Sequence, residues 1–497
     1  MKLAVRLGAI FAMVLGFSTF GLPRVAAAGL CAAPGGAGGC YSTIQAAVDA
    51  ASAGDTVTVR SGTYTEAVSI TKGITLQGSG SAVIDATGLV TGITIANTSG
   101  VTVSNFTIEN AGDLGIDVES SSKVTISGNS LLQDDKNANP DGSCSGPAMP
   151  DEDQCGNGVF LNGVTNSTIA GNTSENNVYG VVLTDDSGPS SGNTISGGTF
   201  THNLQCGIVI ASHNPKAPNG IFNNVIKDNF SSYNHASGVG VFGSGPGTDT
   251  HNNVVDGNTL IDNWHGGVTL HVHAPGVTNN DNQITNNFLS NDNIAGDDSA
   301  GDSLTTGIIL ASAAQPITGT VITGNTISNV AIGIFLGNTA NTTLSDNTIS
   351  ATVAPVMTVP AGAIPNPGSK PTSGVTATPY VWPTTGGLSS AFAVSFATAG
   401  AAQGKVLFGT SCSGLTMTAT QDQFAGTTQH WVLVSRDDLS SSGIGLTPGT
   451  TYYYEVVSVT SGRVTTDNNG GACYKVTIPT AANSTAAPMP PAPSTSA

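Results

Sequence analysis

A four-residue pattern of glycine, apolar residue, any residue and apolar residue recurs along the middle of the chain. Clear copies begin at Gly115, Gly158, Gly180, Gly207, Gly238, Gly267, Gly307 and Gly333. From the second copy onward, the glycines lie 22, 27, 31, 29, 40 and 26 residues apart, which is the spacing found in solenoid repeats. Because one such unit cannot bury its own apolar face, successive units must stack on one another.

A second short apolar stretch recurs in step with the first, as in "STIAGN" from residue 167, "NVIKDN" from residue 224 and "NVVDGN" from residue 253. The glycines, the β-branched residues and the shortness of the segments exclude helices. In a strand, the two apolar residues of each tetrad lie on the same face. Equivalent strands of successive units must then stack in parallel around an apolar column, so the sequence predicts an all-β parallel β-helix over residues 29–354.

The stretch ahead of the repeats predicts a cap for one end of this solenoid. "YSTIQAAVDAASAGDTVTV" from residue 41 holds a short amphipathic helix, for which Ser42 and Gln45 form a capping-box pattern. This opening, followed by "GITLQGSG" and the coils, resembles that of pectate-lyase-like right-handed parallel β-helix proteins, over residues 40–350. The resemblance implies a right-handed coil, as does the general rule for parallel crossovers. It implies no single activity, because these proteins include lyases, hydrolases, epimerases and adhesins.

Beyond the repeats the pattern changes to that of a second domain. Residues 355–379 are rich in Pro, Gly and Ser, which is typical of a linker. Residues 380–480 alternate apolar and polar positions in short runs, which predicts an antiparallel β-sandwich. "LTPGTTYYYEVVSV" from residue 446 resembles a late strand of fibronectin type III-like domains, with Tyr452 or Tyr454 as the corner tyrosine. Residues 481–497 are typical of a disordered tail.

The N-terminus and the cysteines predict an extracellular protein. Residues 1–28 carry Lys2 and Arg6, an apolar run and then "AAA", which is typical of a cleaved secretory signal peptide, although a membrane anchor is the alternative. No later segment is apolar enough to span a bilayer. The sequence has seven cysteines, which suits an oxidising compartment. We expect three disulfides, which join Cys31 to Cys40, Cys144 to Cys155 and Cys412 to Cys473. The remaining cysteine, Cys206, is then expected to be a thiol packed at a coil corner.

Four short corners, those before Gly180, Gly207, Gly238 and Gly267, align into columns of polar residues. Four residues before each glycine we predict an inward asparagine ladder of Asn176, Asn203, Asn234 and Asn263. The neighbouring columns should then point outward; they are Glu175, His202, Tyr233 and Asp262, and Asn177, Leu204, His235 and Trp264. Since coils are ~4.8 Å apart, these residues form a strip between two long insertions at residues 131–156 and 290–306. Ordinary solvated corner residues are the alternative interpretation.

The aromatic and titratable residues of this strip predict polysaccharide binding. Tyr233 and Trp264 offer flat amphipathic rings for sugars, with Glu175 and His265 as further binding residues. Glu175 and Asp262 are about 14 Å apart by the coil spacing, whereas glycosidase carboxylates lie ~5 to 9 Å apart. The enzyme hypothesis is therefore an acid–base couple of the kind used by lyases and epimerases, in which His202 or His235 and Tyr233 move a proton and Asp262 orients them.

The charge of the chain limits the partners and the chemistry. With 14 basic and 32 acidic residues the net charge is −18, so nucleic acid and anionic membranes are poor partners. No arginine lies between Arg60 and Arg436. The arginine-dependent sites of β-helix pectate lyases and pectin esterases therefore have no counterpart in the coils.

The first insertion contains a partial match to an oxygen-ligand calcium loop. Asn137, Asn139 and Asp141 stand where such a loop begins, but Ala148 replaces the bidentate glutamate. We expect calcium at this insertion, with a solvated acidic loop as the alternative. Copper is not expected, because the chain has six methionines and no cluster of Met and His.

These patterns lead to two hypotheses for function. The first is a secreted β-helix protein that binds extracellular polysaccharide at the corner strip and cleaves or epimerises it, as a lyase, an epimerase or a glycoside hydrolase-like enzyme. The second is a non-catalytic structural or adhesive protein whose coils form a rigid rod.

Overall fold

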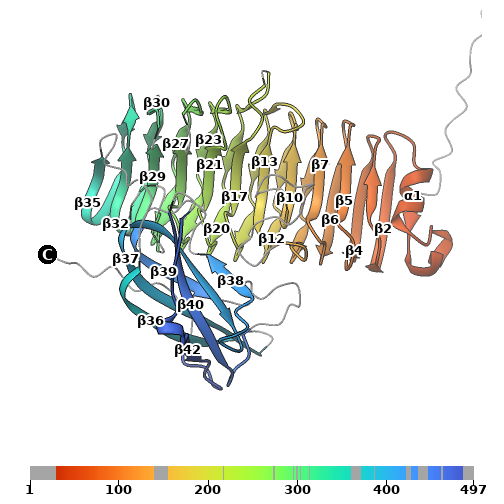
Figure 1. Cartoon of the computed structure of the whole chain (residues 1–497). Helices are drawn as coiled ribbons and strands as arrows, with labels where there is room; N and C mark the ends of the chain where they lie inside the picture. Colours follow the sequence, from red (N-terminus) through yellow and green to blue (C-terminus); the bar gives the residue numbers. More distant parts are fainter. Residues whose placement is uncertain are drawn as a thin grey trace, which may run out of the picture.

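The computed structural model describes residues 30–138, 155–216, 218–272, 275–294, 304–312, 314–359, 371–384, 387–420, 427–434, 446–460 and 463–484, together with Gly296, Asp297, Ala300 and Asp302. A long stack of coils runs from helix α1 (Ile44–Ala50) to strand β35 (Thr348–Val359), and a smaller antiparallel unit lies beside its C-terminal half (Figure 1). The predicted signal peptide at residues 1–28 lies outside the described residues.

Each coil in the middle of the stack contributes two short strands and one longer strand to the main sheet, and a further short strand, such as β22 (Asp249–His251), to a separate four-stranded sheet. In one coil the three strands of the main sheet are β19 (Val225–Lys227), β20 (Phe230–Ser232) and β21 (Val239–Gly243). They pair in parallel with β23 (Val254–Asp256), β24 (Thr259–Ile261) and β25 (Val268–Val272) of the next coil. The inward residues form one continuous column of Val, Ile and Leu, with relative exposures of 0–2% for most of its members. The predicted right-handed parallel β-helix is therefore confirmed.

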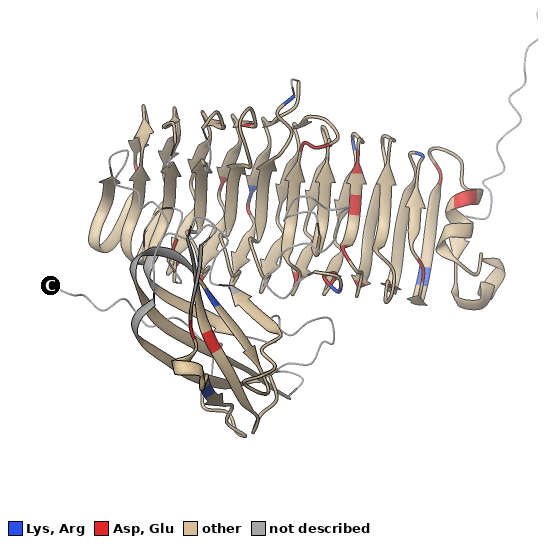
Figure 2. Cartoon of the chain, in the orientation of Figure 1, with Lys and Arg blue, Asp and Glu red and all other residues tan. Residues whose placement is uncertain are grey.

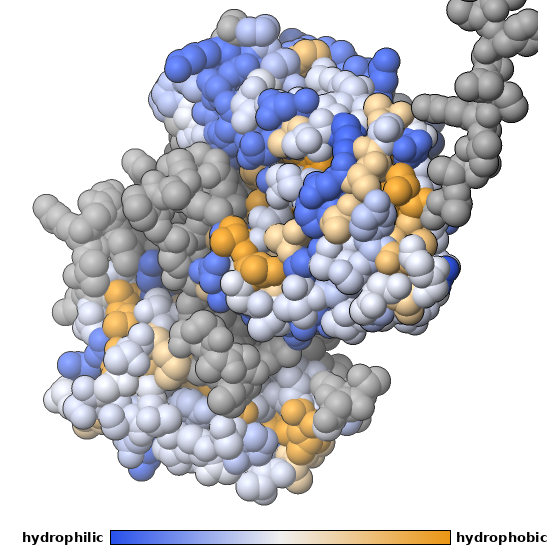
Figure 3. Space-filling view, turned by 90° about the vertical axis from the view of Figure 1, so that its right-hand side faces the viewer, coloured by the Kyte–Doolittle hydropathy of each residue, from blue (hydrophilic) through white to orange (hydrophobic). Residues whose placement is uncertain are grey.

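Helix α1 covers the N-terminal end of this column, as predicted. Its own residues Ile44, Ala47 and Val48 are buried on the side that faces the column. Figure 3 shows a mixture of polar and apolar residues on the surface at this end. The predicted capping box is wrong. The Thr43 side chain caps the helix by accepting a hydrogen bond from the backbone N–H of Ala46 at 3.2 Å. The Glu66 carboxylate, from the chain after β2 (Thr56–Tyr64), accepts hydrogen bonds from the first helical N–H groups.

The longer strands are buried on both faces. Strand β13 (Tyr179–Thr184) and strand β17 (Ile208–Ser212) have no exposed residue. On the outer face, Phe160, Val182 and Val209 form an apolar cluster against which Ala138 of the first insertion packs. Further along, Ile309 and Phe335 belong to a second cluster with Ala300 and Leu304 of the second insertion. Both insertions therefore contact the outer face of the same sheet, because outward apolar side chains must be shielded from water.

The connection between the two units is shorter than the predicted linker at residues 355–379. Strand β35 continues to Val359, since Val356 and Met357 still pair with β32 (Thr326–Gly337) of the preceding coil. The first strand of the second unit, β36, begins at Pro371 (Pro371–Thr384). Pro355 is tolerated within β35, because β35 pairs with β32 and, among the described strands, its other edge has no further strand of the coil that needs the missing N–H.

The second unit is antiparallel, as predicted. Its central strand β37 (Gly387–Gly409) pairs with β36 and β39 (Thr427–Val434) through its first half. Its second half pairs with β38 (Met417–Thr420) and β40 (Thr451–Thr460), and β40 also pairs with β41 (Arg463–Asp467) and β42 (Tyr474–Thr477). Phe392, Phe408 and Tyr454 lie in the core that these strands enclose. We call this unit the sandwich.

Two contacts of the sandwich bear on the sequence predictions. The Tyr452 hydroxyl accepts a hydrogen bond from the backbone N–H of Thr447 at 3.0 Å, which is the interaction expected of a corner tyrosine. The backbone N–H of Val381 donates to the side-chain oxygen of Asn483, and the side-chain amide of Asn483 donates to Pro379. The start of the predicted disordered tail at residues 481–497 is thus held against strand β36.

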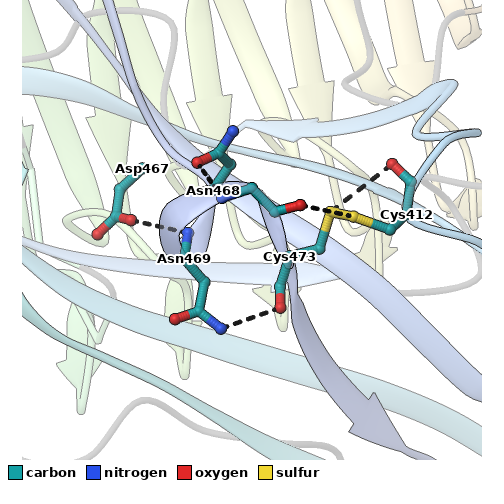
Figure 4. Close-up of a disulfide and its surroundings, with 6 residues drawn as sticks. Cys412, Asp467, Asn468, Asn469 and Cys473 are labelled. Atoms are coloured by element: carbon teal, nitrogen blue, oxygen red, sulfur yellow. Dashed lines mark hydrogen bonds between the residues drawn. A yellow bond between two sulfur atoms is a disulfide. The ribbon is translucent and has the colours of Figure 1, made fainter.

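The cysteines pair as expected wherever both partners are described. Disulfides join Cys31 to Cys40 and Cys412 to Cys473, and Figure 4 shows the second of these beside the turn of Asp467, Asn468 and Asn469. Cys155 is disulfide-bonded, and Cys144 lies outside the described residues. Cys206 is buried and is not part of a disulfide. In the part of the chain that the structure describes, no helix is long and apolar enough to cross a membrane.

Candidate functional site

A ladder of buried asparagines supports the corner at which the candidate residues lie. The amide oxygens of Asn203, Asn234 and Asn263 each accept a hydrogen bond from the backbone N–H of the rung before, at 3.2–3.3 Å. The ladder ends at Asp292, which takes the same place for Asn263. The rung of the preceding coil is Asn177, which accepts from the backbone N–H of Asp134. The prediction of Asn176 is wrong, because this corner is one residue shorter than the next three.

The residue before each rung turns the chain with a left-handed backbone. Asn176, His202, Tyr233 and Asp262 have φ angles of 57°, 57°, 55° and 58°, and this conformation directs their side chains away from the core column. The prediction that Glu175 belongs to this column is wrong, because Glu175 ends strand β12 (Thr173–Glu175) and pairs with Thr201. Its carboxylate is nevertheless 3.7 Å from the Nδ1 atom of His202.

His202, Tyr233 and Asp262 form the predicted contiguous strip on three successive coils. The rings of His202 and Tyr233 stack with their centroids 5.2 Å apart, and both side chains are exposed. Burial on one side, and the charge and hydrogen bonding of Asp262, raise the pKa of Tyr233. Asn291 of the following coil holds the Asp262 carboxylate with a hydrogen bond of 2.7 Å. Tyr233 is therefore a hydroxyl donor at neutral pH.

The second predicted column is only partly available to a ligand. His235 stacks on Trp264 with ring centroids 4.1 Å apart. The edge-to-face partner of Trp264 is Trp431 of the sandwich, whose ring centroid lies 5.3 Å away. Trp264 is thus packed against two other rings and is not the free sugar platform that the sequence suggested. His265 is also unsuitable for direct binding, because it is only 8% exposed.

A buried histidine–aspartate pair lies close to the strip and was not predicted as a unit. The Nε2 atom of His271 is 2.9 Å from a carboxylate oxygen of Asp297, and both side chains are buried. Burial alone would raise the pKa of Asp297, but the attraction and hydrogen bond of His271 and the charge of His265 bring it well below its usual value. His271 belongs to β25 and Asp297 to the second insertion, so no short-range sequence pattern joins them.

The same insertion holds a second buried carboxylate. Burial raises the pKa of Asp302 to about 7, although hydrogen bonds from Thr306 and Leu304 act in the opposite direction. The Asn293 side chain also donates to the backbone oxygens of Asp302 and Leu304. These hydrogen bonds hold the second insertion in a fixed conformation next to strand β29 (Thr306–Ser312).

Of the three predicted calcium ligands, Asn137 is the one that lies among the described residues, and its side chain contacts Asp113. Burial raises the pKa of Asp113, and a hydrogen bond from the Asn137 side chain opposes this shift. Asn139 and Asp141 lie outside the described residues. Among the residues that are described, no group of three or more His, Cys, Asp or Glu side chains is placed to hold a metal ion.

Comparison with known proteins gives one family match. Residues 48–242, less than half of the chain, match the family described as periplasmic copper-binding protein (NosD). A search of curated proteins finds no match.

Solved structures similar to this chain share little sequence with it. The mannuronan C-5 epimerase AlgE4 A-module of Azotobacter vinelandii is 18% identical, with 63% of this chain and 92% of that chain covered and a TM-score of 0.43. A polygalacturonase from Erwinia carotovora ssp. carotovora is 13% identical, with coverages of 66% and 94% and a TM-score of 0.49. The surface adhesin PfbA of Streptococcus pneumoniae is 14% identical, with coverages of 70% and 95% and a TM-score of 0.43. The pairing of the coils shows that this chain folds as a parallel β-helix, and its residues 48–242 are similar to the NosD family.

Proposed function

We propose that this protein binds an extracellular polysaccharide along the corner strip, with the stacked rings of His202 and Tyr233 as the platform. The observation that supports this proposal most directly is the exposure of the two rings on adjacent coils, with centroids 5.2 Å apart. Carboxylates lie on either side, Glu175 near His202 and Asp262 near Tyr233. Sugar rings bind to surfaces of this kind, in which flat amphipathic rings adjoin hydrogen-bonding groups.

The charge around the strip favours a neutral polysaccharide. The four corners, residues 172–180, 199–207, 230–238 and 259–267, contain no lysine or arginine. Figure 2 shows that charged residues are sparse along the coils as a whole. A uronate chain would bring its own carboxylates next to Glu175 and Asp262, and this like-charge contact is unfavourable unless a cation lies between them.

Proton transfer on the bound sugar is the finer part of the proposal. His202 is the exposed base candidate, whereas His235 is covered by Trp264. Tyr233 keeps its proton, because its pKa is raised by burial and by Asp262. This step needs a uronate chain, with a cation between it and Glu175 and Asp262, because the sugar carboxylate is what makes the neighbouring C5–H acidic. His202 then accepts the C5 proton, and Tyr233, oriented by Asp262, donates a proton to the glycosidic oxygen as the C4–O bond breaks and a C4–C5 double bond forms.

Binding is tested with a panel of a neutral glucan, a neutral mannan, polygalacturonate and alginate, each with and without calcium. We expect the wild-type protein to bind a neutral member, and the double change His202→Ala with Tyr233→Ala to weaken that binding about tenfold or more. The matched control is His251→Ala. His251 also stacks on an aromatic ring, that of Phe222, but it lies on a different sheet of the coil.

Two outcomes separate binding from catalysis. Release of reducing ends or unsaturated products by the wild type, abolished in Tyr233→Phe while binding persists, would support the acid–base role. Binding without any product would leave the protein as a binding module. If the wild-type protein binds no member of the panel, the proposed function is contradicted and the rigid-rod alternative is favoured.

A further inference from the structure

The asparagine ladder beneath the strip has an aspartate at each end. Asp292 is the last rung, and its Oδ1 atom accepts hydrogen bonds from the backbone and side-chain nitrogens of Asn263, at 3.1 and 2.9 Å. At the other end, the backbone N–H of Asp134 donates to Asn177, and the Oδ1 atom of Asp134 accepts from the N–H of Ala111 at 3.0 Å. Both aspartates are fully buried. Their Oδ1 atoms therefore act as the amide oxygen of an asparagine rung does.

The Oδ2 atom of Asp292 takes the place of an asparagine nitrogen. It lies against the glycine that opens the longer strand of the preceding coil, as the Nδ2 atom of Asn263 does. That nitrogen donates to the backbone oxygen of Ser231 at 3.1 Å, and the strand register puts Leu260 in the equivalent place one coil further on. Within the described part of the chain, Oδ2 of Asp292 has no hydrogen-bond partner. An ionised oxygen here would face a carbonyl oxygen, whereas a protonated one can donate to it.

Asp134 repeats this arrangement on the far side of the four short corners. Its Oδ2 atom also lies against the opening glycine of the preceding coil and has no hydrogen-bond partner among the described residues. The Nδ2 atom of Asn177, the next rung, donates to the backbone oxygen of Leu131 at 3.1 Å, and the register puts Ile108 in the equivalent place for Asp134. Both ends of the ladder therefore have an oxygen where the inner rungs have a donor.

The surroundings of both carboxyl groups favour the protonated form. Burial is the main cause and raises the pKa of each well above the usual value of an aspartate. Hydrogen bonds to the two Oδ1 atoms act in the opposite direction. The charged groups that face these carboxyls are Asp262 for Asp292, which raises the pKa further, and Asp135, Glu109 and Lys136 for Asp134, of which Lys136 lowers it.

We propose that Asp134 and Asp292 are neutral carboxylic acids that donate hydrogen bonds through Oδ2, so that the ladder is a pH-sensitive element that loses stability as pH rises. Each group lies at the root of one of the two insertions, residues 131–156 and 290–306. The backbone oxygen of Asp292 also accepts a hydrogen bond of 2.9 Å from the N–H of Thr306, at the far end of its insertion. Loss of either proton would leave a buried charge without a partner, which is costly. This inference is independent of the proposed polysaccharide binding.

The test is the pH dependence of solenoid unfolding by denaturant in the wild type, Asp134→Asn and Asp292→Asn. The folded chain holds the proton more tightly than the unfolded chain, so the stability that a neutral carboxyl provides is complete below about pH 4 and is lost as pH rises. An asparagine does not titrate. The unfolding constant of the wild type relative to either variant should therefore rise by up to about tenfold per pH unit above about pH 4.

The matched control is Asp228→Asn. Asp228 also has a left-handed backbone and precedes a buried asparagine rung, Asn229, but its side chain is exposed. We expect the unfolding constant of the wild type relative to this variant to stay the same as pH changes. The control thus separates the loss of a buried carboxyl from the loss of one negative charge.

Infrared difference spectroscopy detects the neutral carboxyls directly. At about pH 6 an exposed aspartate is ionised, so the C=O band of neutral carboxylic acids should be weaker in the double variant Asp134→Asn with Asp292→Asn than in the wild type. The band should not vanish, because burial also raises the pKa of Asp117 and of Asp302 to about 7.

The two single variants test the two ends of the ladder separately. A relative unfolding constant that does not change with pH, or a carboxylic acid band that is as strong in the double variant as in the wild type, would overturn the proposal. A pH dependence as large in Asp228→Asn as in the two rung variants would also overturn it, because net charge would then be the cause. If one rung variant does not fold, the other decides whether its own rung is neutral.

Discussion

Asn234 illustrates how single residues hold the coils together. Its side-chain oxygen accepts two hydrogen bonds from Asn203, one from the backbone and one from the side chain. The two hydrogens of its side-chain NH2 group have three acceptors within 2.9–3.1 Å, namely the side-chain oxygens of Asn263 and Ser231 and the backbone oxygen of Phe200. Every polar atom of a fully buried amide is thereby satisfied, which is the condition for burying it without a large loss of stability.

The change Asn234→Ala should destabilise the solenoid by about 3 kcal/mol, because buried groups of Asn203, Asn263, Ser231 and Phe200 all lose their hydrogen bonds to this side chain. The measurement is the denaturation midpoint followed by circular dichroism. Thr199→Ala is the control, since Thr199 lies half-exposed on the outside of β16 (Thr199–Thr201). An effect of Asn234→Ala no larger than that of the control would show that the ladder contributes little.

The left-handed residues beside the ladder connect stability to the site. A positive φ is uncommon for residues other than glycine, asparagine and aspartate. His202 and Tyr233 adopt it, whereas an asparagine occupies the equivalent place in the coils of Asn176 and Asn291. Replacement by asparagine would relieve backbone strain, so the presence of two aromatic residues here is consistent with a role other than turning the chain.

At the scale of elements, the terminal helix α1 depends on a residue that is distant in sequence. The Glu66 carboxylate accepts hydrogen bonds from the N–H groups of Ile44 and Gln45 at 2.7 and 3.0 Å. A negative charge at a helix N-terminus is stabilised both by these donors and by the helix dipole. The side chain thus ties the cap to the first coil.

We expect Glu66→Ala to weaken the cap by about 1 to 2 kcal/mol, as the loss of an N-terminal helix cap does. Glu66→Gln, which keeps one acceptor oxygen, should have a smaller effect. Hydrogen exchange of the amides of residues 44–50 is the measurement, and faster exchange there in Glu66→Ala is the expected result. Glu119→Ala is the control on strand β7 (Leu114–Glu119). Unchanged exchange in Glu66→Ala would contradict the capping role.

On the scale of the whole molecule, two separate cores predict two unfolding transitions. The column of the solenoid and the core around Phe392 and Phe408 share no residue, and only a short segment of chain connects the units. We expect calorimetry to resolve a solenoid transition and a sandwich transition. The double change Cys412→Ser with Cys473→Ser opens a loop closed by residues 61 apart.

Opening this loop should destabilise the sandwich by about 4 kcal/mol, from the entropy that the open chain regains, and leave the solenoid transition in place. The reciprocal variant, Cys31→Ser with Cys40→Ser, should affect only the solenoid. A single transition that moves in both variants would show that the contact at Trp431 makes the two units unfold together.

Several features could be predicted from the sequence because they rest on local repetition. The tetrads beginning at Gly207, Gly238 and Gly267 determine strand spacing, and with it the coil and the column of apolar residues. The same spacing brings His202, Tyr233 and Asp262 to one corner. Where a coil departs from the repeat, the prediction fails, as the one-residue shift from Asn176 to Asn177 shows.

Only the tertiary structure decided which candidate residues are accessible. Trp264 meets Trp431, His265 is buried, and Asp297 pairs with His271; each of these outcomes depends on a segment whose position is unrelated to the repeat. The sequence by itself determined the solenoid and the residues on its corner, because a parallel coil is governed by short-range periodicity. The covering of that corner depended on the insertions and the sandwich, since docking between distant surfaces leaves no periodic pattern in the chain.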